Sequence, residues 1–127
     1  MVDLRSDLAR ARGLGSAKEG VRHWWMQRVS AMALVPLGLW FVISCFKLAH
    51  MSLVDLRVWL DTGANFLLFA LFVVTLFYHM QLGLQVVIED YVHGERAKWT
   101  MLLLNIFACF FLGAFCLVSL FKLTFGG

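Results

Sequence analysis

The segment that decides the fold reads TGANFLLFALFVVTLFYHMQLGLQVVI and covers residues 62–88, between Asp61 and Glu89. It contains no Asp, Glu, Lys or Arg, and it exceeds the roughly 20 apolar residues that span about 30 Å of hydrocarbon. The bilayer core offers no water to backbone N–H and C=O groups, so a crossing segment folds as a helix, which pairs these groups internally. We therefore predict a transmembrane helix here.

Two further uncharged windows flank this segment. The sequence predicts an all-α integral membrane protein with three transmembrane helices, near residues 29–48, 62–91 and 99–122. An N-terminal segment of residues 1–28 is expected to precede the membrane anchor domain, which covers residues 29–127. The second window is the longest and is expected to tilt or protrude from the bilayer. Pro36 is expected to kink the first helix. The first loop contains an amphipathic stretch from Ser52 to Leu60, with a capping pattern formed by Ser52 and Asp55.

The composition agrees with a membrane protein. Hydrophobic residues make up 61% of the chain and charged residues 15%, whereas soluble domains average about half and about a quarter. The formal net charge is +3, but the basic residues lie at the ends of the predicted spans, where membrane topology explains them. No nucleic-acid partner is therefore expected.

The distribution of Lys and Arg predicts the orientation. The N-terminal segment and the second loop share one side of the membrane and carry eight basic residues, against three on the other side. This excess places the N-terminus in the cytoplasm. The first 28 residues contain no apolar signal segment, and Asp3, Asp7 and Glu19 disfavour a transit peptide. We expect a multi-pass protein of the bacterial inner membrane.

His79 is the most informative single residue, because an ionisable group inside a membrane helix is a functional candidate. It is either a haem ligand or a histidine hydrogen-bonded between helices. Gly83 lies one turn further on the same face and leaves room for a flat, bulky group. No other histidine lies within a predicted span. If His79 binds haem iron, the second axial ligand is expected from another membrane chain.

Two groups of polar residues accompany His79 on the cytoplasmic side. Asp90 lies eleven residues after His79, which places it about 20° away around the helix and about 16 Å along it. Asp90 and Tyr91 are suited to anchor a small head group, although each is also common at a helix end or membrane interface. Arg28 is suited to pair with haem propionates, and topology alone also explains its position.

Two stretches resemble a known family. The stretch GVRHWWMQRVSA, residues 20–31, resembles the start of the succinate dehydrogenase hydrophobic membrane anchor subunits. The stretch HMQLGLQVVIEDYVH, residues 79–93, is similar to the haem-ligand helix of that family, in which ten residues separate the histidine from Asp-Tyr. Three spans and a cytoplasmic N-terminus also agree with the family.

The resemblance implies specific roles for residues of this chain. His79 would ligate haem b, with a histidine of the larger cytochrome b membrane subunit opposite. Tyr91 would donate a hydrogen bond to a ubiquinone carbonyl oxygen, and Asp90 would orient that site or relay protons. Arg28 would hold a haem propionate, with His23 as a helper. Ser30 is a weaker quinone-site candidate, because the family's quinone-site serine lies mainly on the other membrane chain.

The resemblance also implies a division of labour within succinate:quinone oxidoreductase, respiratory complex II. A flavoprotein subunit with FAD oxidises succinate to fumarate, and an iron–sulfur subunit passes the electrons to ubiquinone where it meets the two membrane chains. The present chain would anchor and tune cofactors without catalytic residues of its own. Two alternatives remain: an anchor of a fumarate reductase, and a structural membrane adaptor without cofactors.

Overall fold

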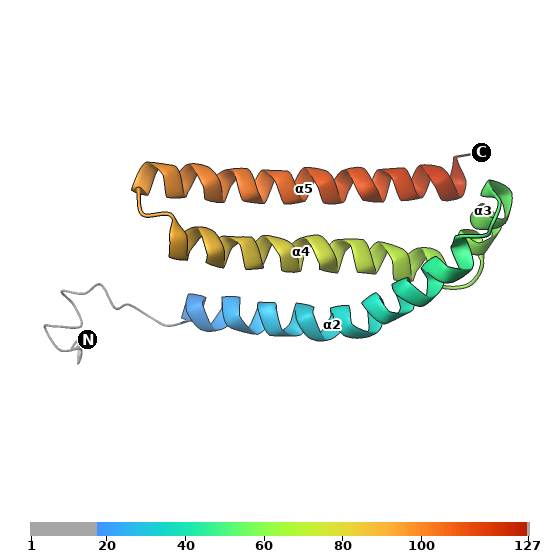
Figure 1. Ribbon diagram of the computed structural model, residues 1–127, viewed down its shortest axis with the longest axis horizontal. Helices are drawn as coiled ribbons and strands as arrows, with labels where there is room; N and C mark the ends of the chain where they lie inside the picture. Colours follow the sequence, from blue (N-terminus) through green and yellow to red (C-terminus); the bar gives the residue numbers. More distant parts are fainter. Residues whose placement is uncertain (1–17, 127) are drawn as a thin grey trace, which may run out of the picture.

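The computed structural model describes residues 18–126, with side-chain surroundings from residue 20 onwards. Four helices follow one another along the chain: α2 (Lys18–Leu48), α3 (Leu53–Asp61), α4 (Asn65–Tyr91) and α5 (Glu95–Phe125) (Figure 1). By length and composition, α2, α4 and α5 are able to cross a membrane. No strand occurs in residues 18–126. The predicted all-α membrane class with three spans is confirmed.

α4 is the central helix of the bundle. It lies between α2 and α5 and packs against both (Figure 1). The start of α2 and the α4–α5 loop lie at one end of the bundle, and α3 lies at the other end beside the C-terminal end of α5 (Figure 1). α3 contacts α4 and α5. The functional candidates of α4 are thus flanked by a helix on two sides.

The observed helices differ in length from the predicted spans. α2 begins at Lys18 rather than near residue 29, and α5 covers Glu95–Phe125 rather than residues 99–122. α4 has 27 residues and is the shortest of the three, against 31 each for α2 and α5. Hydropathy detects only the part of a helix within hydrocarbon, whereas helices continue through the polar interface. The basic residues Arg5, Arg10 and Arg12 and the acids Asp3 and Asp7 lie outside the described residues.

The second window is the longest uncharged segment, but α4 is the shortest spanning helix because the turn before it uses part of the window. Gly63 has φ +61°, a left-handed conformation that glycine adopts without steric cost. Asn65 then begins α4, and its side-chain Nδ2 donates to the Trp59 carbonyl oxygen at 2.8 Å. This bond ties the start of α4 to the end of α3. With 27 residues, α4 still exceeds the roughly 20 residues that span the hydrocarbon core, and the tilt or protrusion of this span stays a prediction.

Two local predictions for the first half of the chain are confirmed. α2 contains Pro36 and bends in its second half (Figure 1). Ser52 caps α3: its Oγ accepts a hydrogen bond from the Asp55 backbone N–H at 3.2 Å and donates to Asp55 Oδ2 at 2.7 Å. The rings of Trp40 and Trp59 stack 6.0 Å apart, which fixes α3 against α2.

α4 and α5 are joined by a buried polar contact. Asn105 of α5 is only 7% exposed, and its Nδ2 donates to the Gln81 backbone carbonyl of α4 at 2.9 Å. Two turns further along α5, a Cβ on Gly113 would lie 3.5 Å from Phe77, so this glycine allows close helix approach. Elsewhere the three spanning helices are little buried. In the most apolar window of each helix, only 11% to 17% of the residues are buried within the chain. Polar and small residues therefore set the α4–α5 register.

Asn105→Ala tests this register. We expect the free energy of unfolding to fall by about 1 kcal/mol, because interhelical hydrogen bonds in membranes contribute roughly 0.6–2 kcal/mol. The measurement is the thermal unfolding midpoint in detergent. Ser119→Ala, an exposed change on the same helix, is the control. Equal midpoints for the two variants would show that the Asn105 contact does not stabilise the bundle.

Candidate functional site

His79 lies well inside α4, the central helix, and its side chain is partly buried. Its Nδ1 lies 2.8 Å from Oγ of Ser30 on α2. Ser30 is 5% exposed, and its Oγ also donates to the Gln27 backbone carbonyl at 3.0 Å. In the described part of the chain, no hydrogen bond is recorded for His79 Nε2. The ring is thus held on one edge, and its other nitrogen remains available.

The face of α4 that Gly83 occupies beside His79 is loosely packed against α2. A Cβ built on Gly83 would meet a single side-chain atom within 4 Å, Nε2 of Gln27 at 3.8 Å. Gln27 Oε1 and His23 Nε2 are buried without a hydrogen-bond partner among the described residues. Buried polar atoms are normally paired. Both atoms belong to the part of α2 that precedes Ser30.

Asp90 and Tyr91 end the same helix that carries His79. α4 is continuous from Asn65 to Tyr91, so the predicted placement of His79 and Asp90 on one face, about 16 Å apart along the axis, holds for a regular helix. Asp90 is exposed, and Tyr91 is 77% exposed. Both side chains are free to contact a ligand or a neighbouring chain.

The structure separates the two propionate candidates of α2. His23 lies seven residues before Ser30 and shares its face to within about 20°, so it faces α4. Arg28 lies two residues before Ser30, about 160° away around the helix. Its guanidinium is exposed and lies 5.4 Å from the ring centroid of Trp24. Within this chain, His23 is therefore on the His79 side of α2 and Arg28 is not.

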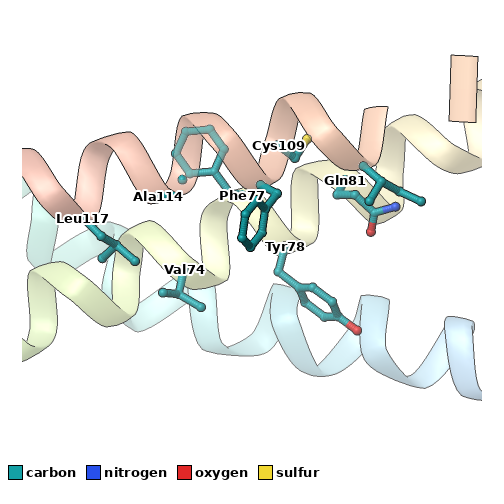
Figure 2. A pocket seen from close by; sticks show the side chains of 10 residues that line it. Val74, Phe77, Tyr78, Gln81, Cys109, Ala114 and Leu117 are labelled. Atoms are coloured by element: carbon teal, nitrogen blue, oxygen red, sulfur yellow. The ribbon is translucent and has the colours of Figure 1, made fainter. Parts of the chain in front are cut away.

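An apolar groove of about 500 Å³ lies between α4 and α5. Figure 2 shows side chains of both helices around it. Gln81, which lines the groove, is about 160° around α4 from His79. The groove and the histidine face are therefore on opposite sides of the helix, and the groove is not part of the His79 site. The groove is lined by Val74, Phe77, Tyr78, Gln81, Ile106, Cys109, Phe110, Gly113, Ala114 and Leu117.

Sequence reasoning missed two polar contacts between helices, one of Ser30 at the site and one of Asn105 on the opposite side of α4. Ser30 was considered only for the quinone site, and its contact with His79 was not foreseen. Asn105 was not singled out at all. The available signal was the same for both, since each is a polar side chain within an apolar window, and such residues usually bond across helices. The partner of each depends on helix register, which hydropathy does not contain.

Comparison with known proteins adds to this geometry. The family described as Succinate dehydrogenase/Fumarate reductase transmembrane subunit matches residues 3–113. The chain belongs to this family. The match includes α2, α3, α4 and most of α5. The transmembrane subunit class agrees with the three spans of the structure.

The chain is also similar to several proteins that are named as membrane anchor subunits of succinate dehydrogenase. A succinate dehydrogenase hydrophobic membrane anchor subunit from Rickettsia bellii is 38% identical over 103 residues, which cover 80% of this chain and 81% of the relative. One from Paracoccus denitrificans is 35% identical over 97 residues, or 76% and 75% of the two chains. A succinate dehydrogenase membrane anchor subunit from Reclinomonas americana is 33% identical over 84 residues, or 64% and 70%. No solved structure shows a significant match.

Proposed function

We propose that this transmembrane subunit anchors succinate:quinone oxidoreductase, binds haem b through His79, and helps to form the site of quinone reduction. The observation that carries the proposal is a histidine held inside the central spanning helix by Nδ1, with Nε2 available and Gly83 beside it. Histidine is a common axial ligand of haem. The family and its relatives support the anchor role.

The residues present fit haem b. Gly83 leaves space next to His79 for a flat macrocycle, and Gln27 borders that space. His23 lies toward the N-terminal end of the same α2 face, and its Nε2 is buried without a hydrogen-bond partner among the described residues; it would bond a polar haem substituent. When bound, the haem iron would accept and release single electrons. This chain would orient the group and exclude water from it.

We propose that a residue of the larger cytochrome b membrane subunit would hold the haem together with His79 of this chain. The three other histidines, His23, His50 and His93, lie near the ends of the spans or in loops, so none shares the depth of His79. Arg28 lies about 160° around α2 from Ser30 and is exposed. We propose that it reaches a haem propionate from the side on which that subunit packs, as a charge-assisted contact.

The quinone end of the site is proposed to lie at Asp90 and Tyr91. Reduction of a quinone consumes two electrons and two protons, so the site needs a hydrogen-bond donor to a carbonyl oxygen and a route for protons. The Tyr91 phenol supplies the donor. The exposed Asp90 carboxylate supplies a proton-exchanging group beside it. These residues position the head group, and no covalent step occurs on this chain.

The proposed partners follow from this role. They are the larger cytochrome b membrane subunit, the iron–sulfur subunit and the FAD-containing flavoprotein subunit, with ubiquinone as the electron acceptor. The proposed location is the bacterial inner membrane with the N-terminus in the cytoplasm, on the basis of the eight-to-three excess of basic residues. The family description also includes fumarate reductase, but the relatives named as succinate dehydrogenase subunits favour oxidation of succinate.

Replacement of the proposed haem ligand is the primary test. We expect His79→Ala to lower haem b content of the purified complex by about tenfold or more, because even outer-shell changes cost 10–100-fold in metal affinity. Content is measured from the b-type absorbance per protein. His50→Ala, at an exposed histidine in the first loop, is the control. Unchanged absorbance in His79→Ala would favour a cofactor-free adaptor.

Tyr91→Phe tests the quinone end. Loss of the phenol hydroxyl removes one hydrogen bond of about 0.5–1.5 kcal/mol, so we expect succinate–quinone reductase activity to fall by up to about tenfold. Haem content should match the parent. Tyr78→Phe is the matched control, because Tyr78 is the other of the chain's two tyrosines and lines the groove on the other side of α4. Parent-like kinetics in Tyr91→Phe would remove Tyr91 from the site.

The orientation is tested with reporters fused to the C-terminus. Three spans and a cytoplasmic N-terminus place the C-terminus in the periplasm. We therefore expect activity from a C-terminal alkaline phosphatase fusion, which folds only in the periplasm. A C-terminal fusion of green fluorescent protein should stay dark after export through the general secretion route. The opposite pattern would contradict the proposed topology.

A further inference from the structure

Among the described residues, Ser30 is hydrogen-bonded to the His79 side chain from another helix. It belongs to α2, which lies beside α4 (Figure 1). Its Oγ is 2.8 Å from His79 Nδ1, and the residue is 5% exposed. This distance is that of a hydrogen bond. The Ser30 hydroxyl therefore holds the His79 ring at its Nδ1 edge.

The hydrogen bonds of Ser30 bear on which nitrogen of His79 carries the proton. A serine hydroxyl has one proton to donate and two lone pairs that accept. Ser30 donates that proton to the Gln27 carbonyl oxygen at 3.0 Å, a local contact common for serine in helices. With that proton directed to Gln27, Oγ is an acceptor toward His79, and this pairing matches the tautomer that carries its hydrogen on Nδ1.

The consequence is a defined state of the second ring nitrogen. With the hydrogen on Nδ1, a neutral imidazole has an unshared electron pair on Nε2. That pair is what a metal ion binds, and metal-ligating histidines almost always donate their other N–H to a protein acceptor. Gln27 belongs to the same turn of α2, and its Nε2 is the atom nearest to Gly83. The same turn of α2 therefore orients His79 through Ser30 and lies beside Gly83 through Gln27.

We infer that Ser30 is a positioning residue for the haem ligand, which fixes the His79 tautomer and ring plane so that Nε2 faces the iron. This inference rests on the proposed function. It assigns Ser30 to the haem site rather than to the quinone site. By accepting the Nδ1 hydrogen, Ser30 makes the imidazole more electron-rich, which favours the oxidised iron.

The test is Ser30→Ala in the complete membrane complex. We expect haem content to fall several-fold, and the midpoint potential of the remaining haem to shift to a more positive value. Ser44→Ala is the matched control, because Ser44 is buried in the same helix at 4% exposure and loses the same hydroxyl. It should leave content and potential at parent values. Ser30→Thr keeps a hydroxyl and should restore the parent potential.

Three results would overturn the inference. They are a parent-like content and potential in Ser30→Ala, an equal change in Ser44→Ala, and a Ser30→Thr variant that behaves like Ser30→Ala although it retains the hydroxyl. The test is separable from the proposed function. Loss of haem in His79→Ala with normal haem in Ser30→Ala refutes the role of Ser30 alone, whereas retention of haem in His79→Ala refutes haem ligation by this chain.

Discussion

The absence of water in the bilayer core is the constraint on which the structure depends. Backbone groups are satisfied within α2, α4 and α5, so the spans themselves need no partner. Polar side chains inside the spans do need one. Between the spanning helices of the described residues, side-chain hydrogen bonds occur at two places, where Ser30 meets His79 and where Asn105 meets the Gln81 carbonyl. These two contacts join α2 and α5 to the two sides of α4. They fix how each helix is aligned along α4, whereas the surrounding apolar side chains add contact area.

This constraint also explains why the chain buries so little of itself. Most large apolar side chains of the spans are exposed in the described residues, which would be prohibitive in water and carries no such cost in hydrocarbon. Close packing is confined to positions where a small residue permits it. Gly113 against Phe77 is the example on α5, and Gly83 beside Gln27 is the looser counterpart on the α2 side. Gly113 thus belongs to a closely packed helix contact, whereas Gly83 belongs to a looser one, where a ligand is proposed to bind.

Sequence reasoning predicted the features that depend on one segment at a time. Hydropathy located the three spans, the Ser52–Asp55 pattern located the cap of α3, and helix periodicity placed His79 and Asp90 on one face. Sequence reasoning failed for features that depend on how two helices are aligned, or on how far a helix continues into the polar interface of the membrane. α2 begins at Lys18, about ten residues before the uncharged window, because polar residues continue the helix beyond the apolar segment that hydropathy detects. The pairing of Ser30 with His79 depends on the register of α2 against α4, and no periodicity within either helix contains that information.

The position of α4 in the bundle accounts for how one short subunit combines anchoring with a site. Its two packed faces have different tasks: Gln81 and Phe77 hold α5, while His79 and Gly83 face α2. Because a helix is a stiff rod with about 1.5 Å of rise per residue, the continuous course of α4 itself fixes the separation of His79 from Asp90. A ligand bound at the histidine and a head group at the helix end would thus be held at a constant distance.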